Sequence, residues 1–105
     1  MRGTAQARYR SMRLNPEQLD MAREALLELE EVQARKTNGT LRPGDASNVA
    51  VGVLRRLARG LTHRTGSGKH VAPAGLSGVI AVAGNGWVGE SARQLKALFP
   101  QLQED

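Results

Sequence analysis

Residues 15–38, NPEQLDMAREALLELEEVQARKTN, decide the fold class, because they carry the signals of one long helix from start to end. Asn15 is a good N-cap, and Pro16 suits the first helical position, where its missing N–H has no helical partner to lose. Acidic residues fall in the first turn and basic residues in the last, as the helix dipole favours. Asn38-Gly39 then ends the helix.

The apolar residues of this stretch recur at helical spacing and predict its buried face. The core stripe consists of Leu19, Ala22, Leu26 and Leu29, widened by Ala25 and Val32. Leu27 lies off this stripe, so we expect it to contact a second protein chain.

A second helix is predicted from about Ala46 to Arg59, capped by Asp45 and closed by Gly60. Its buried face is expected to hold Ala46, Ala50, Val53, Leu54, Leu57 and Leu61. The spacing of the opposite face places four residues on one stripe, namely Asn48, Gly52, Arg55 and Arg59.

The last third of the chain leaves one alternative open. Pro73 could open a helix of small residues, or residues 79–83 could form a strand that Asn85-Gly86 turns back on itself. A final helix is expected over residues 90–99, ended by Pro100. The predicted fold is mainly α, a small bundle of three to four helices, and the strand alternative adds one short β-hairpin around Asn85-Gly86. Residues 1–13 are predicted to form a basic, flexible arm and residues 14–105 a single helical domain.

Composition excludes several classes of protein. The 105 residues contain no cysteine, so disulfides, thiolate catalysis and cysteine-based metal sites are ruled out. The longest apolar run is far too short to cross a bilayer, and we expect no membrane association. No secretory signal is visible at the start, which predicts a cytoplasmic protein.

The net charge of +5 is distributed very unevenly along the chain. Residues 1–13 carry four arginines and no acid, and residues 14–36 carry six acids and three bases. Residues 37–75 carry six bases and one acid, whereas residues 76–105 are close to neutral. Such asymmetry indicates a polyanionic partner, or attraction between the two halves of the chain or between two copies of it.

The strongest candidate site is the second helix together with the loop that follows it. Five positive charges fall within 15 residues, at Arg55, Arg56, Arg59, Arg64 and Lys69. Guanidinium groups grip phosphates, which supply most non-specific affinity for nucleic acid. Asn48 could read an adenine edge, and the basic arm could follow a duplex through Arg8, Arg10 and Arg13.

Residues 64–70, RTGSGKH, are rich in glycine but do not form a phosphate-binding loop of the nucleotide-hydrolysing kind. That motif needs glycine where His63 stands and Ser or Thr where His70 stands. The two histidines alone are too few ligands for a metal. We therefore expect no enzyme, no cofactor, no metal and no small-molecule substrate.

These observations predict a small basic protein that binds nucleic acid, DNA or RNA, as a regulator or accessory protein, and that forms a homodimer. Leu27 and the lone Trp87 are the expected contacts to a partner or second copy. The alternative is a protein-interaction module, such as an inhibitor, adaptor or assembly subunit, that docks its basic face on an acidic protein.

Overall fold

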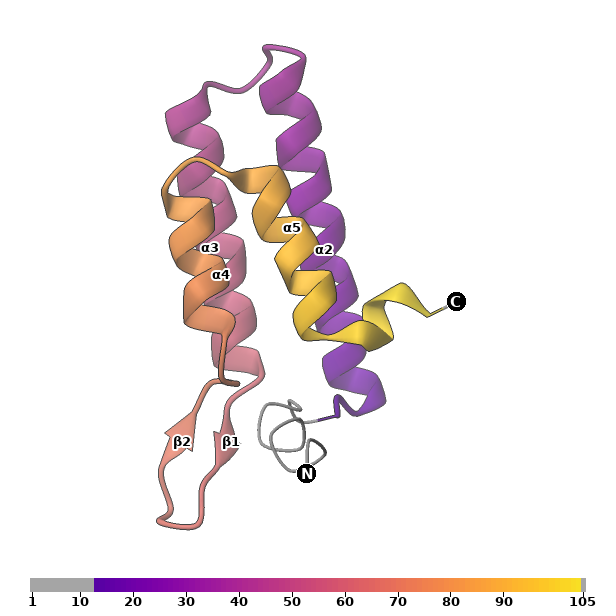
Figure 1. Ribbon diagram of the computed structural model, residues 1–105, viewed down its shortest axis with the longest axis vertical. Helices are drawn as coiled ribbons and strands as arrows, with labels where there is room; N and C mark the ends of the chain where they lie inside the picture. Colours follow the sequence, from indigo (N-terminus) through magenta and orange to yellow (C-terminus); the bar gives the residue numbers. More distant parts are fainter. Residues whose placement is uncertain (1–12, 105) are drawn as a thin grey trace, which may run out of the picture.

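The computed structural model describes residues 13–104, which form four α-helices and a two-stranded antiparallel ribbon (Figure 1). In chain order the elements are α2 (Pro16–Thr37), α3 (Pro43–Gly60), β1 (His63–Arg64), β2 (His70–Val71), α4 (Leu76–Gly84), α5 (Val88–Leu98) and the 3₁₀ helix η1 (Pro100–Gln103). The predicted mainly-α fold is confirmed.

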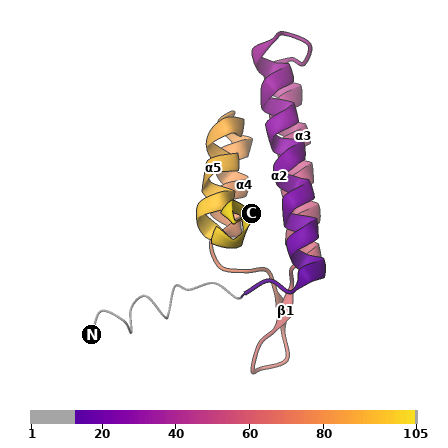
Figure 2. The same ribbon diagram turned by 90° about the vertical axis from the view of Figure 1, so that its right-hand side faces the viewer.

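The helices pack in two layers. The long antiparallel pair α2–α3 forms one layer, and the shorter pair α4–α5 covers one of its faces (Figure 2). α4 packs on α3 and α5 packs on α2, so the four helices surround one shared apolar core. The opposite face of the α2–α3 layer is covered by no other helix of the described chain. None of the helices in residues 13–104 is both long and apolar enough to span a membrane.

Helix α2 begins and ends as its sequence predicts. The Asn15 side chain accepts a hydrogen bond from the Gln18 N–H at 2.8 Å, and the Gln18 side chain accepts one from the Asn15 N–H at 3.1 Å. This reciprocal capping box satisfies two N–H groups that the helix leaves without partners. At the other end, Asn38 is the C-cap, and Gly39 adopts a positive φ of 83° that side chains disfavour. The stripe residues are buried, apart from the half-buried Leu19.

Helix α3 buries all six residues expected to face the core. Its start differs from the prediction, because the helix begins at Pro43 and not at Ala46. Pro43 occupies the first helical position, where its fixed φ favours the helix. Asp45 therefore lies inside the first turn and is not the N-cap, a position held by Arg42 without a side-chain hydrogen bond.

Of the two alternatives left open for residues 73–88, the structure has the helix, and its β-hairpin lies at residues 63–71 instead. Asn85-Gly86 does not turn a hairpin but joins α4 to α5, with Gly86 at a φ of 98°. Residues 79–83 are helical, since Leu76, Val79 and Ala83 are buried at helical spacing against the core. The helix opens at Leu76, after a Gly75 with a φ of 93°, and not at Pro73.

The C-terminal residues close the bundle. α5 ends at Leu98, and Pro100 starts η1, as expected of a residue that cannot continue the helix. Gln101 accepts a hydrogen bond from the Leu14 N–H at 2.9 Å and donates one to the Leu14 carbonyl oxygen at 3.3 Å. The two ends of the described chain are thereby joined across the bundle.

Candidate nucleic-acid interface

The β1–β2 hairpin projects beyond one end of the helical bundle (Figures 1 and 2). His63 pairs with Val71 and Arg64 pairs with His70. Among the described elements, each of the two strands contacts only the other. This projection is supported by its own backbone hydrogen bonds and by its attachment to the bundle.

The glycine-rich residues form the turn of this hairpin. The Thr65 N–H donates to the Lys69 carbonyl at 2.7 Å, and the Gly68 N–H donates to the Thr65 carbonyl at 2.9 Å. The Lys69 N–H donates to the Thr65 hydroxyl at 3.2 Å. Within residues 13–104, the N–H groups of Gly66 and Ser67 have no hydrogen-bond partner, an arrangement to which an anion can bind. The strand β2 follows this turn, whereas a nucleotide-hydrolysing loop leads directly into a helix.

The basic residues of the hairpin are all exposed. Arg64 and Lys69 flank the turn, with His63 and His70 beside them. No group of three or more metal-ligating side chains occurs in the described part of the chain. The hairpin is therefore a small cationic projection whose side chains face solvent.

The predicted stripe on α3 leads to the base of this hairpin. Asn48, Arg55 and Arg59 are exposed on the side turned away from the core, and Gly52 between them leaves open space where a side chain would lie. Arg55 and Arg59 form no ion pair with any described residue. The stripe and the hairpin together carry four exposed cations, Arg55, Arg59, Arg64 and Lys69, on consecutive elements of the chain.

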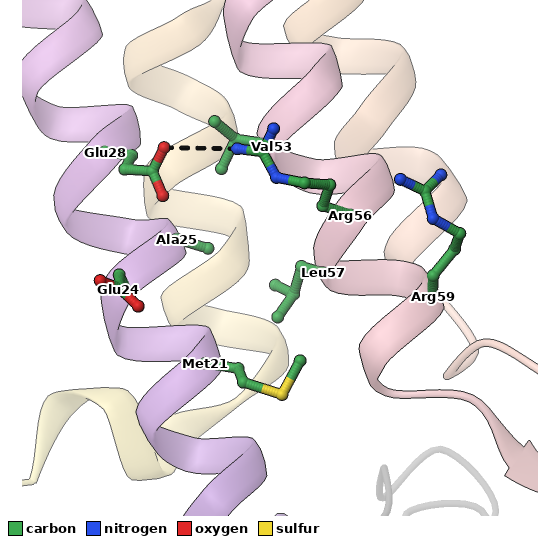
Figure 3. A pocket seen from close by; sticks show the side chains of 8 residues that line it. All are labelled: Met21, Glu24, Ala25, Glu28, Val53, Arg56, Leu57 and Arg59. Carbon is green, nitrogen blue, oxygen red and sulfur yellow. Dashed lines mark hydrogen bonds and ion pairs between the residues drawn. The ribbon is translucent and has the colours of Figure 1, made fainter.

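Arg56 differs from its neighbours, although the sequence groups it with them. Its guanidinium lies 3.5 Å from the Glu28 carboxylate of α2, in an ion pair of two exposed side chains. Figure 3 shows Arg56 reaching toward α2, whereas the Arg59 guanidinium points away from α2. Arg56 therefore belongs to the seam between α2 and α3 more than to the basic stripe.

That seam contains a shallow groove of about 420 Å³ (Figure 3). Ala25, Val53 and Leu57 form its apolar floor, and Met21 lies at one end. Glu24 and Glu28 line the α2 side, and Arg56 and Arg59 line the α3 side. Sequence reasoning missed this groove, because it lies between helices whose pairing no local pattern specifies.

Acidic residues are absent from the segment of sequence that carries the basic surface. The sequence has no Asp or Glu between Asp45 and Glu90, which covers most of α3, the hairpin and α4. The chain also enters α2 at the hairpin end of the bundle, where the exposed Arg13 precedes the helix (Figure 1). The predicted sites Arg8 and Arg10 lie outside the described residues.

The two predicted partner contacts are both exposed but belong to different parts of the fold. Leu27 is 65% exposed on α2, and Trp87 is 67% exposed in the connection between α4 and α5. The structure adds Met21 and Val49, exposed by 39% and 44%, which the sequence analysis did not single out. Exposed apolar side chains of this size indicate contact surfaces when they gather with others.

Comparison with known proteins gives no further assignment. No protein-family model matches this chain, and no curated protein or solved structure matches it significantly.

Proposed function

We propose that this protein binds double-stranded nucleic acid through the β1–β2 hairpin and the outer stripe of α3, as a small regulatory or accessory protein. One observation supports the proposal most strongly. The cationic hairpin projects from the bundle and follows directly after the exposed basic stripe of α3, in a segment of sequence without acidic residues. Arg55, Arg59, Arg64 and Lys69 would neutralise phosphates, which supplies most non-specific affinity. The exposed Arg13 precedes α2 at this same end of the bundle.

The dimensions of the surface suit a duplex. The stripe from Asn48 to Arg59 spans about 16 Å at ~1.5 Å per helical residue. A two-stranded ribbon is narrow enough to enter the major groove, which is about 12 Å wide. Gly52 lets the helix backbone approach closely, and Asn48 offers an amide that can pair with adenine.

A duplex is favoured over single strands because the basic surface lacks aromatic side chains on which bases could stack. Phe99 is buried, and Trp87 lies in the α4–α5 connection, at the opposite end of the bundle from the hairpin. The surface can therefore hold a backbone and enter a groove, but it provides no stacking platform within residues 13–104.

The test is a fluorescence-anisotropy titration with duplex DNA, duplex RNA and single-stranded DNA at two salt concentrations. With about four or five phosphate contacts, affinity for the duplex should fall by roughly two to three orders of magnitude between ~50 and ~200 mM salt. No binding at the lower concentration would overturn the proposal and favour an acidic protein as the partner of this face.

A matched pair of variants locates the binding surface. Arg64→Glu with Lys69→Glu should weaken duplex binding at least tenfold and reduce the salt slope by about 2. Arg93→Glu with Lys96→Glu on α5 changes the net charge equally and should leave affinity within about threefold. Equal losses in both variants would mean that only overall charge matters, and the assignment to the hairpin would be wrong.

A further inference from the structure

The outer face of the α2–α3 layer, opposite α4 and α5, carries two parallel rows of exposed side chains beside the groove (Figure 3). On α2, residues spaced by three and four lie on this face, and they are Met21, Glu24, Glu28, Glu31 and Arg35. The row is acidic in its middle and has a methionine at one end and an arginine at the other.

The facing row on α3 has the opposite charge pattern. Its members, spaced by four and seven residues, are Asp45, Val49 and Arg56. Because α2 and α3 are antiparallel, Arg56 lies level with the acidic middle of α2, and Asp45 lies toward the end that holds Arg35. The Glu28–Arg56 ion pair joins the two rows within one chain.

We propose that this face binds a second copy of the chain about a two-fold axis parallel to the helices. That axis places α2 of one copy over α3 of the other, at the same height along the bundle. Glu24 and Glu28 then face Arg56 of the second copy, and Arg35 approaches its Asp45. A two-fold axis that lies in the plane of the interface but runs across the helices would place α2 on α2. It would bring the two acidic rows together, so charge complementarity favours the axis parallel to the helices.

The face is large enough for a specific interface. α3 has 18 residues. With a rise of ~1.5 Å per residue and a width of ~10 Å per helix, the two adjacent helices present a face of about 27 by 20 Å. Pairing two such faces buries roughly 1,100 Å² in total, just above the ~1,000 Å² expected of a specific contact. Met21 and Val49, both partly exposed in the single chain, supply apolar contacts beside the groove floor.

The arrangement has a geometric consequence for the hairpins. Because the axis runs parallel to the helices, both hairpins project from the same end of the dimer. A dimer of this kind holds two cationic projections toward one ligand, which raises avidity without any new contact. The dimer itself does not depend on the proposed function, because its formation is measured without nucleic acid.

The test measures molar mass by light scattering and sedimentation at increasing protein concentration. The unaltered chain should approach twice its 11.3 kDa mass. Glu28→Lys and Arg56→Glu should each weaken the dimer at least tenfold, because each places like charges across the interface. Glu30→Lys, with the same charge change on α2 outside the charged row, should leave the dimer constant within about twofold.

Mixing the two charge-reversed variants gives the decisive result. A heterodimer restores both interchain pairs, while the pair within each chain stays broken, so recovery of the dimer mass only on mixing requires this interface. A monomer at high micromolar concentration, or no recovery on mixing, would overturn the proposal. Circular dichroism of each variant shows whether the helices are retained.

Discussion

The helical bundle and the β1–β2 hairpin are supported by different forces. The bundle is held by an apolar core drawn from all four helices, in which Leu29, Leu54 and Leu95 are fully buried. The hairpin has no buried residue between Leu61 and Pro73, and those two residues anchor its base. Stability therefore rests on the buried side chains of the bundle, whereas the proposed binding uses the hairpin and the outward side chains of α3, so each can be altered without the other.

The largest expected effect comes from the core. Leu54→Ala should lower the free energy of unfolding by about 2–5 kcal/mol, because it removes a fully buried side chain and leaves a cavity. Leu27→Ala, at an exposed site on α2, should change it by no more than ~0.5 kcal/mol. Urea denaturation measures both, and similar values for the two variants would contradict the division between core and surface.

A smaller effect is expected at the start of α2. Asn15→Ala removes the acceptor of the capping box and should cost about 1 kcal/mol. Asn48→Ala, on the exposed stripe of α3, is the control and should be nearly neutral for stability. If Asn48→Ala lowers the free energy of unfolding as much as Asn15→Ala does, Asn48 has a structural role that the hydrogen bonds of residues 13–104 do not show.

Replacing the hairpin sharpens the comparison further. A glycine-serine linker in place of residues 63–71 should leave the free energy of unfolding within roughly 0.5–1 kcal/mol, because loop length has only a logarithmic effect. Duplex binding should be lost at the same time. Thermal unfolding followed by circular dichroism, with anisotropy on the same sample, separates the two outcomes, and loss of the fold would show that the hairpin is part of the core.

The smallest effect is a pH dependence on α5. Hydrogen bonds from Arg93 and Gln94 to the Glu90 carboxylate, with the nearby Arg93 charge, hold the pKa of Glu90 below its usual value. A lowered pKa in the folded chain stabilises the fold above the unfolded pKa, and this contribution disappears as the pH falls through the folded pKa. The melting temperature of Arg93→Ala should therefore lie slightly below the parent's at neutral pH and converge with it in acid. A constant difference would contradict the pairing.

The helices could be predicted because their signals are local. The cap at Asn15, the apolar spacing of α2 and α3 and the stop at Pro100 all act within a few residues, and each is confirmed. Local signals left helix and hairpin open for residues 73–88, because Asn85-Gly86 suits a helix–helix connection as well as a tight turn. The packing of α4 on α3 decides between them, and it depends on contacts distant in sequence.

The candidate site shows the same limit. The shared face of Asn48, Arg55 and Arg59 follows from helical spacing alone. The separation of Arg56 from that face could not be foreseen, because it depends on which side of α3 meets the acidic row of α2. A sequence pattern places charged residues on one face of a helix, but the neighbouring helix determines which of them form an ion pair.

Trp87 gives the protein an intrinsic fluorescent probe at a single position. It is the sole tryptophan of the chain, and two thirds of its side chain already faces solvent in the folded state. Its fluorescence should therefore shift little toward the red on unfolding and is a poor reporter of the fold. For the same reason, a blue shift in the folded protein would reveal any molecule that covers the α4–α5 connection, at the opposite end from the hairpin.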